Sequence, residues 1–459
     1  MTPMVDLLDD LRAALPAEVL VTDPVSTALF ARDHAAWAAA GTPAAVVRAR
    51  TPEQVQATVQ ACVRHGVPVV ARGAGSGLAG GANAGDGWVV ISLERMDAVL
   101  EVDVAERLAV VQPGVIGDAL RAHVATLGLW YPPDPASASW STVGGNVATN
   151  AGGLCCVKYG VTGDYVLGLQ VVTGTGELVR VGRRTRKGVA GYDLTSLLVG
   201  SEGTLGIVTE VTVRLRPLRE PERTIAGFFD SLVDAGRAVT GVVAAGLVPS
   251  AFELVDRHCL AAVDAWKGST FSTDAAVILL ARIDTAGAAG DLEAEQLVGC
   301  FQSAGATWAA VSTDQQEADA LFDARRLALS AVEQLGPVLV EDVCVPIGAL
   351  PEMLRRVELA AEQHDVVIAT VAHAGDGNVH PFIVVPAGDE AAGVRAHAAF
   401  EQMMRDAHAL GGTVTGEHGI GLLKRAGLAQ EVSPAVLAMQ QAVKHALDPH
   451  GILNPGKAI

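Results

Sequence analysis

The sequence predicts an α+β protein with more than one domain. Its 459 residues are more than a single hydrophobic core usually organises. Short strand-like alternations recur among helical patterns along the chain. The texture changes after Pro217, where Ala-rich helical patterns alternate with strands. We therefore expect a first domain over residues 1–218, a second over 219–412 and a C-terminal segment over 413–459.

A well-marked helix opens the pattern of the first domain. Residues 51–54, Thr-Pro-Glu-Gln, combine a capping box with proline at the first helical position, and apolar residues then repeat at helical spacing up to Gly66. The next expected elements are strands at 67–72 and 88–93, a hairpin of 98–104 with 107–112, a helix at 118–127, and strands at 169–173 and 204–216.

The second domain alternates strands and helices. Its expected elements are strands at 224–229 and 276–283, helices at 232–245 and 291–304, and two further apolar runs at 366–371 and 382–385. The tail from residue 413 is rich in glycine again.

Composition limits the classes of partner. A formal net charge of -18 would repel nucleic-acid phosphates, so we expect no nucleic-acid partner. The six cysteines lack C-x-x-C spacing and fit a reducing compartment. The first ten residues carry acids where a secretory signal is basic and then apolar, and no long uncharged apolar stretch follows. We expect a cytoplasmic protein without a transmembrane segment, and a peripheral association with the membrane stays open.

A glycine-rich loop follows the strand at 67–72. Gly75, Gly77 and Gly80 match the pattern G-x-G-x-x-G. A Rossmann site requires these glycines to open a helix, whereas this loop leads into another strand, so we reject that interpretation. A flexible loop is the plain alternative. Seven glycines between residues 73 and 87 favour a row of accessible backbone N–H groups, as an anion-binding nest requires.

Two later segments have a similar composition. Residues 139–153, Ser-Trp-Ser-Thr-Val-Gly-Gly-Asn-Val-Ala-Thr-Asn-Ala-Gly-Gly, follow Pro-Pro-Asp-Pro at 132–135. Residues 200–207 read Gly-Ser-Glu-Gly-Thr-Leu-Gly-Ile. Their amide and hydroxyl side chains could bind a phosphate, a ribityl chain or the edge of a flavin ring, and their glycines could let the backbone lie against that ring.

These three segments, in this order, resemble the FAD-binding domain of the vanillyl-alcohol oxidase/PCMH superfamily, and the chain is most similar to its group of FAD-linked glycolate oxidases and D-lactate dehydrogenases. The C-terminal Leu-Asn-Pro-Gly-Lys at 453–457 adds to the resemblance. The resemblance implies a PCMH-type FAD-binding domain of two subdomains. It also implies a ferredoxin-like α+β substrate (cap) domain that carries the metal-site hairpin, and a C-terminal segment that closes on the flavin.

By the same resemblance, many residues of the first domain and one near the C-terminus are expected to bind FAD. They are Arg72, Gly73, Ala74, Gly75, Ser76, Gly77, Gly80, Gly81, Pro132, Asp134, Ser139, Thr142, Gly145, Asn146, Thr149, Gly152, Gly153, Tyr159, Glu202, Gly206, Ile207 and Asn454. The first loop has no histidine, so FAD is expected to be bound non-covalently. Cys155 and Cys156 are more typical of buried thiols than of flavin attachment points.

The sharpest chemical pattern is His373-Ala-Gly-Asp-Gly-Asn-Val-His380 between two apolar runs. Asp-Gly is a strong hairpin turn. If Asp376 and Gly377 are the two turn residues, His373 lies directly opposite His380, with Cβ atoms about 5 Å apart. Two imidazoles at that separation could bind one ion, although two histidines in a hairpin can also serve packing.

Glu417 offers a third ligand, because it lies in Thr-Gly-Glu-His-Gly at 415–419. Two histidines and a carboxylate with an open position suit Zn(II), Mn(II) or Fe(II). The resemblance implies that His373, His380 and Glu417 bind the metal and that His418 is the catalytic base. It further implies that Arg325 binds the substrate carboxylate, with Arg326 as a weaker candidate. The plain alternative for Arg325 is an arginine on a helix surface.

The expected reaction is the oxidation of a small D-2-hydroxy acid. Arg325 would orient its carboxylate, the metal ion would lower the pKa of its hydroxyl, His418 would accept the proton and the hydride would pass to flavin N5. Asp342-Val-Cys-Val-Pro resembles the D-lactate branch, and Val340 stands about where the 2-hydroxyglutarate branch has a lysine. D-lactate or glycolate is therefore favoured, while D-2-hydroxyglutarate and longer 2-hydroxy acids remain open.

Two other classes of function compete with this hypothesis. A metal-dependent hydrolase would use the histidines and Glu417 but would leave the glycine segments without a role. A non-catalytic flavin subunit would use the glycine segments but would leave His418 and the metal ligands without one. The electron acceptor is undetermined among a quinone, a cytochrome and an electron-transfer flavoprotein, and the sequence is compatible with a homodimer.

Overall fold

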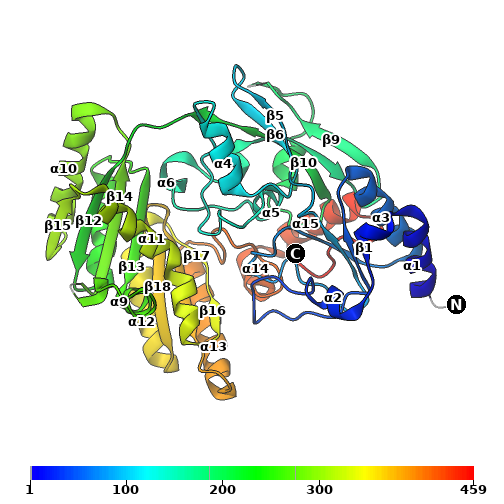
Figure 1. Ribbon diagram of the computed structural model, residues 1–459. Helices are drawn as coiled ribbons and strands as arrows, with labels where there is room; N and C mark the ends of the chain where they lie inside the picture. The colour runs from blue at the N-terminus through cyan, green and yellow to red at the C-terminus, as the bar shows by residue number, and fades with distance from the viewer. Residues whose placement is uncertain (1–2, 186, 274) are drawn as a thin grey trace. The chain divides into compact units, whose positions relative to one another are not determined.

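The computed structural model describes residues 3–185, 187–273 and 275–459 (Figure 1). The chain divides into two compact units. Unit 1 consists of Met1–Gly152, Val161–Leu218 and Glu417–Ile459, and unit 2 consists of Gly153–Gly160 and Arg219–Gly416. The division into three functional parts stays a prediction, and each unit is described below by itself.

The first sheet of unit 1 has the strand order β1-β2-β4-β3, in which β4 runs parallel to both of its neighbours. Its strands and the helices before and between them are α1 (Pro3–Ala14), β1 (Leu20–Val21), α2 (Pro24–Ala28), β2 (Ala45–Arg48), α3 (Pro52–His65), β3 (Val69–Arg72) and β4 (Val89–Ser92). The predicted start and end of α3 are confirmed, because Thr51 accepts a hydrogen bond from the Gln54 amide and Gly66 ends the helix with φ +63°. Leu7 of α1 and Val59 of α3 are buried in the same core as the strands.

A second, antiparallel sheet of unit 1 has the order β5-β6-β10-β8-β9. Its strands are β5 (Val99–Asp103), β6 (Leu108–Val111), β8 (Val166–Val172), β9 (Leu178–Gly182) and β10 (Ile207–Arg214). The predicted hairpin of β5 and β6 is confirmed. The remaining elements of this unit are α4 (Gly117–Ala125), β7 (Leu129–Trp130), α5 (Val143–Thr149), α7 (Leu194–Leu198), β11 (Arg216–Pro217), α14 (Arg425–Glu431) and α15 (Pro434–Leu447).

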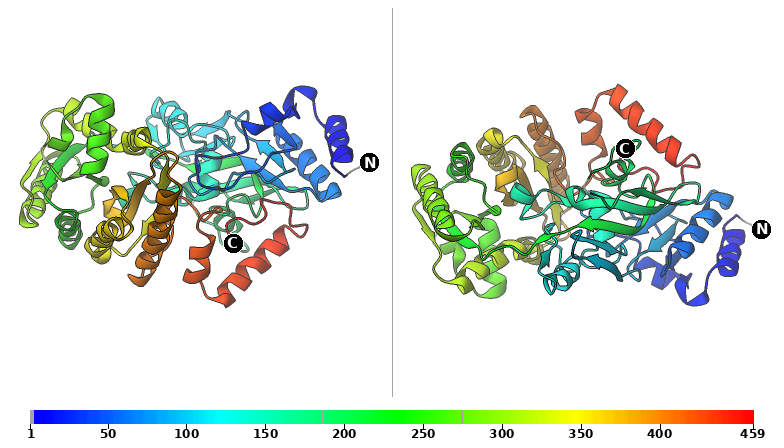
Figure 2. Two further views of the ribbon diagram at one scale, coloured as in Figure 1. Left: turned by 90° about the horizontal axis from the view of Figure 1, so that it is seen from below. Right: turned by 90° about the horizontal axis from the view of Figure 1, so that it is seen from above.

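The C-terminal segment returns to β3. The Val69 amide donates to Ile452 O at 2.8 Å, and the Asn454 amide donates to Val69 O at 2.8 Å. Figure 2 shows α14 and α15 in red next to each other near the end of the chain. This return brings Asn454 to the strand that precedes the glycine-rich loop.

Unit 2 is built on one large antiparallel sheet with the order β15-β12-β14-β13-β18-β19-β16, and β17 also pairs with β19. Its strands are β12 (Arg223–Phe229), β13 (Ala251–Asp256), β14 (Val277–Ile283), β15 (Trp308–Val311), β16 (Val338–Val340), β17 (Val343–Cys344), β18 (Val367–His373) and β19 (Asn378–Val384). The first four strands have the spatial order four-one-three-two. With a helix after the first and after the third strand, this is the ferredoxin-like arrangement that the resemblance implies.

The helices of unit 2 are α6 (Cys156–Tyr159), α8 (Leu232–Ala244), α9 (Arg257–Lys267), α10 (Gly287–Ser303), α11 (Gln315–Val332), α12 (Leu350–His364) and α13 (Glu390–Ala409). Figure 1 shows most of them alongside the sheet. Several begin at side-chain caps, such as Ser231 for α8 and Asp256 for α9. Among residues 3–185, 187–273 and 275–459, no helix is long and apolar enough to cross a membrane.

The short segment with α6 belongs to unit 2, although the residues on both sides of it lie in unit 1. Asp284 holds it there, because this buried carboxylate forms an ion pair with Lys158 and accepts a hydrogen bond from the Tyr159 hydroxyl. These contacts lower the pKa of Asp284 against the effect of burial. A short segment that crosses from one unit to the other in this way leaves no periodic signal in the sequence.

Candidate functional site

The glycine-rich loop begins at Arg72, the last residue of β3. Burial lowers the pKa of the Arg72 guanidinium, whose Nη1 donates to Arg32 O at 2.5 Å. Gly75 has φ +78°, and a Cβ there would overlap that guanidinium. A side chain at position 75 would therefore strain the backbone and displace the Arg72 guanidinium.

Asp33 contacts the same loop by hydrogen bonding. Its carboxylate accepts hydrogen bonds from the amides of Ala35 at 3.0 Å and Ala82 at 3.2 Å, and burial raises its pKa. A Cβ at Gly77 would lie 3.1 Å from Asp33 Oδ2. Because β4 follows this loop directly, the loop opens no helix, and the rejection of a Rossmann site is confirmed.

The second glycine segment meets the first at Thr142. A Cβ at Gly73 would overlap the Thr142 hydroxyl. Thr142 is also the N-terminal cap of α5, where its hydroxyl accepts a hydrogen bond from the Gly145 amide at 3.2 Å. Next to this contact, Asn146 Nδ2 and Ser141 Oγ are buried and have no hydrogen-bond partner within the described part of the chain. Buried donors in that state fit a polar ligand bound at this place.

The third segment is tied to the first by Asn454, whose Nδ2 donates to Gly81 O and to Glu202 O, each at 2.8 Å. The Glu202 carboxylate accepts hydrogen bonds from the amides of Ile420 and Gly421, each at 2.8 Å. Burial nevertheless raises the pKa of Glu202 to about 7. Glu202 thus holds the chain just after residues 417 and 418.

A buried lysine completes this corner of unit 1. Lys457 Nζ donates to Gly81 O at 3.2 Å and to Asn83 O. Burial lowers the pKa of Lys457 to about 8, although Asp33 and Glu202 act in the opposite direction. Three of the predicted FAD-binding segments and the C-terminal Leu-Asn-Pro-Gly-Lys are therefore joined in one network within unit 1.

The remaining predicted FAD residues differ in their surroundings. Asp134 forms an ion pair with Arg121 at 2.9 Å. The Tyr159 hydroxyl donates a hydrogen bond to Asp284 in unit 2. Ser139 is exposed, whereas Ile207 is buried. Their contacts with a cofactor stay predictions.

The predicted register of the histidine hairpin is wrong by two residues. β18 and β19 pair His373 with Asn378 and Val371 with His380, because the loop contains residues 374–377 with Gly377 at φ +76°. A shift of two keeps both histidines on one face of the sheet. Their ring centroids are 5.1 Å apart, so the predicted proximity is confirmed by a diagonal pair instead of a direct one.

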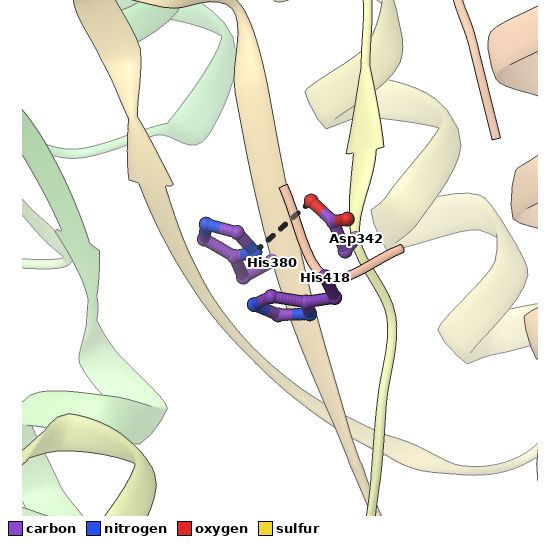
Figure 3. Close-up of side chains that lie close together, drawn as sticks. All are labelled: Asp342, His380 and His418. Atoms are coloured by element: carbon purple, nitrogen blue, oxygen red, sulfur yellow. Dashed lines mark ion pairs between the residues drawn. The ribbon is translucent and has the colours of Figure 1, made fainter. Parts of the chain in front are cut away.

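Each histidine of this pair faces a buried carboxylate. His373 Nδ1 lies 2.8 and 3.0 Å from the two carboxylate oxygens of Glu253 on β13. His380 Nδ1 lies 3.6 Å from Asp342 Oδ1, as Figure 3 shows. For His373, the carboxylate at Nδ1 favours the tautomer with the proton on that nitrogen, which leaves Nε2 able to bind a cation.

Asp342 also fixes the end of unit 2. Its Oδ2 accepts hydrogen bonds from Thr415 Oγ1 at 2.6 Å and from the Gly416 amide at 3.0 Å. A Cβ at Gly416 would overlap the side-chain amide of Asn378, whose Oδ1 is buried without a hydrogen-bond partner in the residues that the structure describes. Glu417 and His418 follow directly and belong to unit 1, where His418 Nε2 lies 3.9 Å from Glu417 Oε1.

Arg325 of α11 is 4% exposed, so the interpretation as a helix-surface arginine is wrong. Its Nε lies 2.7 Å from Glu253 Oε2. Arg326, the weaker candidate, is partly exposed. The structure thus brings Arg325 and His373 to opposite sides of one carboxylate.

Glu253 and Asp342 lie beside the two histidines but were not among the site residues predicted from the sequence. A signal for Glu253 existed, since it is the one acid among the apolar residues 251–255, Ala-Phe-Glu-Leu-Val. All six residues of β13 are buried. A charged side chain in a strand that is buried on both faces needs a specific partner.

Family models match both parts of the chain. Residues 43–182 match the FAD binding domain, and residues 218–458 match the C-terminal domain of FAD linked oxidases. The glycolate oxidase subunit GlcD of Bacillus subtilis is 39% identical over 417 residues, which are 90% of this chain and 88% of that protein. A D-lactate dehydrogenase of Anaerostipes hadrus is 34% identical over 98% of this chain and 97% of its own length.

The fold has solved counterparts. The crystal structure of p-cresol methylhydroxylase with substrate bound has a TM-score of 0.85, with 18% sequence identity, and covers 99% of this chain and 96% of that one. The fold is therefore that of the PCMH-type flavoproteins. From these matches, the chain belongs to the family of FAD-linked oxidases, and its resemblance to the group of glycolate oxidase and D-lactate dehydrogenase is confirmed.

Proposed function

We propose that this FAD-linked oxidoreductase oxidises a small D-2-hydroxy acid, D-lactate or glycolate before others, with the help of a divalent metal ion. Relatives named as a glycolate oxidase component and as a D-lactate dehydrogenase support the class of substrate. The observation that carries the proposal is the group of Arg325, Glu253 and His373, because it places a buried arginine next to a histidine oriented for a cation.

The residues of unit 1 fit FAD. The glycine-rich loop packs closely against Thr142 and Arg72 because side chains are absent at Gly73 and Gly75, and its backbone N–H groups could bind an anion. The buried donors Asn146 Nδ2 and Ser141 Oγ could bind polar atoms of the cofactor. Bound FAD would supply the two-electron oxidation, and this chain would hold and orient it.

The residues of unit 2 fit a divalent cation. Besides Asp284, which pairs with Lys158, the buried acids among the described residues of this unit are Glu253, Asp256, Glu341 and Asp342, and Arg325 is the single buried lysine or arginine. Buried charges of one sign are costly unless cations balance them. His373 and His380 supply two nitrogen ligands, and such an ion supplies Lewis acidity to a hydroxyl oxygen.

We further propose Glu417 as the third ligand. Gly416 is fixed by Asp342, and consecutive Cα atoms are about 3.8 Å apart. Glu417 is the residue that follows this glycine directly in the chain. Zn(II), Mn(II) and Fe(II) all suit two histidines and a carboxylate, so the donor set leaves the choice of metal to experiment.

In this proposal Arg325 binds the substrate carboxylate, since guanidinium geometry matches a carboxylate. His418 accepts the hydroxyl proton at a ring nitrogen, as a general base does at neutral pH. Val340, which is buried in β16, offers no cation to a distal carboxylate, and this favours a substrate without one. An artificial electron acceptor serves in the turnover assay.

The test is anaerobic bleaching of the visible flavin spectrum on addition of D-lactate, glycolate or D-2-hydroxyglutarate. We expect rapid bleaching by the D-2-hydroxy acid that is the substrate, slow bleaching after removal of metal by a chelator, and recovery on addition of Zn²⁺ or Mn²⁺. A flavin spectrum that none of the three acids changes would overturn the substrate class. Bleaching that is insensitive to chelation, in protein without bound metal, would overturn the role of the metal.

The two competing classes give other results in the same assay. A metal-dependent hydrolase would copurify with metal and without flavin. A non-catalytic flavin subunit would contain flavin, and neither bleaching nor turnover with an artificial acceptor would follow.

A further inference from the structure

Glu253 lies at the centre of a buried group in unit 2. On one side, its two carboxylate oxygens lie 2.8 and 3.0 Å from His373 Nδ1. On the other side, Oε2 lies 2.7 Å from Arg325 Nε. Glu253 itself is 0% exposed, and the strand register places it directly opposite His373.

We infer that Glu253 is a positioning residue that couples the metal ligand His373 to the substrate-binding Arg325, an inference that rests on the proposed function. An ionised carboxylate only accepts hydrogen bonds, so the proton of neutral His373 must be on Nδ1. The lone pair is then on Nε2, the atom that can bind a cation. The same carboxylate forms an ion pair with the guanidinium, whose Nε lies 2.7 Å from Oε2 without an aligned hydrogen bond, and this charge contact keeps Arg325 beside the carboxylate that faces His373.

A simple ion pair between Glu253 and Arg325 explains less. Arginine and carboxylate frequently form two parallel hydrogen bonds, and this pair does not. Here both carboxylate oxygens also lie within hydrogen-bond distance of His373 Nδ1. A buried ion pair is in addition weak evidence for stability, since apolar replacements are often as stable. The shared carboxylate is therefore better explained by orientation of the two side chains.

The second histidine offers an internal comparison. His380 Nδ1 lies 3.6 Å from Asp342 Oδ1, beyond hydrogen-bond distance. Asp342 also binds Thr415 Oγ1 and the Gly416 amide. Asp342 therefore orients His380 less strongly than Glu253 orients His373. We expect Glu253→Gln to weaken metal binding more than Asp342→Asn does.

The experiment starts from holoenzyme stripped of metal with a chelator and titrated with Zn²⁺ against a competing indicator dye. We expect Glu253→Gln to weaken Zn²⁺ binding by about 10- to 100-fold, as loss of a carboxylate behind a histidine ligand typically does. The matched control is Glu222→Gln, because Glu222 pairs with Arg219 and Arg282 in the same unit and contacts no histidine in the described structure. It should bind Zn²⁺ as wild type does, with equal flavin content.

A second readout does not depend on metal or activity. In metal-free protein labelled with ¹⁵N-histidine, and with His373→Gln for assignment, we expect His373 to carry its proton on Nδ1. In Glu253→Gln the amide can present either its oxygen or its NH₂ group, so a mixture of tautomers should appear. Steady-state kinetics should show a higher KM in this variant, because Arg325 has lost its anchor.

The outcomes separate the two proposals. If wild type binds no Zn²⁺, the metal in the proposed function fails and this inference fails with it. If wild type binds Zn²⁺, and Glu253→Gln binds it equally well with an unchanged His373 tautomer, only the role of Glu253 is overturned.

Discussion

Replacing Glu202 with glutamine should change how the local stability of the protein depends on pH. Burial raises the pKa of this carboxyl from 4.5 to about 7 in the folded protein, even though the amides of Ile420 and Gly421 donate to it. The folded state therefore binds a proton more tightly than the unfolded state between these pH values. Local stability should fall as pH rises from about 4.5 to about 7, by about 3 kcal/mol.

Glutamine removes this pH dependence, because it is neutral at every pH. Its oxygen can accept from one of the two amides, and the loss of the other hydrogen bond costs about 1 to 3 kcal/mol at all pH values. Hydrogen exchange of the Ile420 and Gly421 amides, corrected for intrinsic rates, measures opening of this segment by itself. That choice avoids a global unfolding curve, which two units need not follow as one transition.

We expect the stability of wild type relative to Glu202→Gln to decrease by about 3 kcal/mol between pH 4.5 and pH 8, within the pH range set by the raised pKa. A relative stability that stays constant would show that the carboxyl titrates alike in the folded and unfolded states. One that increases with pH would show that the two amides stabilise the charge by more than burial destabilises it. Either result would refute the reasoning.

Three further variants test the two halves of the site. Gly75→Ala should lower flavin occupancy at least about 10-fold, because its Cβ would overlap the Arg72 guanidinium at φ +78°. The ratio of flavin absorbance to protein absorbance measures this occupancy. The control variant Gly66→Ala, which has open space around its Cβ, should keep wild-type occupancy. Arg325→Lys should raise KM about 10-fold or more with a smaller change in kcat, as loss of bidentate carboxylate binding predicts; an unchanged KM would contradict the role. His418→Gln should lower kcat by about 10²- to 10⁴-fold with flavin and metal content intact, and activity within 10-fold of wild type would exclude it as the base.

The sequence predicted elements well wherever the signal was local. The helix from residue 52 follows from its cap and its terminal glycine, both of which lie within a few residues of it. The hairpin of β18 and β19 was predicted on the correct face with an incorrect register. Asp-Gly at 376–377 suggested a two-residue turn, but residues 374–376 form a turn of 3₁₀ helix and the loop has four residues. Because strand side chains alternate with period two, an error of two residues left the histidines on the same face.

The missing parts of the site depend on contacts that are remote in the sequence. Glu253 and His373 are 120 residues apart and meet only because β13 pairs with β18. Sequence patterns show that residue 253 is an acid in an apolar strand, and strand order decides which side chain it meets. The same holds for the segment with α6, which Asp284 keeps in unit 2.

The buried charges of unit 2 connect these observations to function. Removing a carboxylate from water costs several kcal/mol unless hydrogen bonds or cations compensate for it. Around the histidine pair, Glu253 and Asp342 are both fully buried, and Arg325 contacts only the first of them in the described structure. If a metal ion on His380 stabilises the Asp342 carboxylate, then removal of that ion should destabilise unit 2 more in wild type than in Asp342→Asn. Thermal unfolding of the chelated and metal-loaded proteins at pH 7 would test this, and an equal effect of metal in both proteins would argue against the balance of charge.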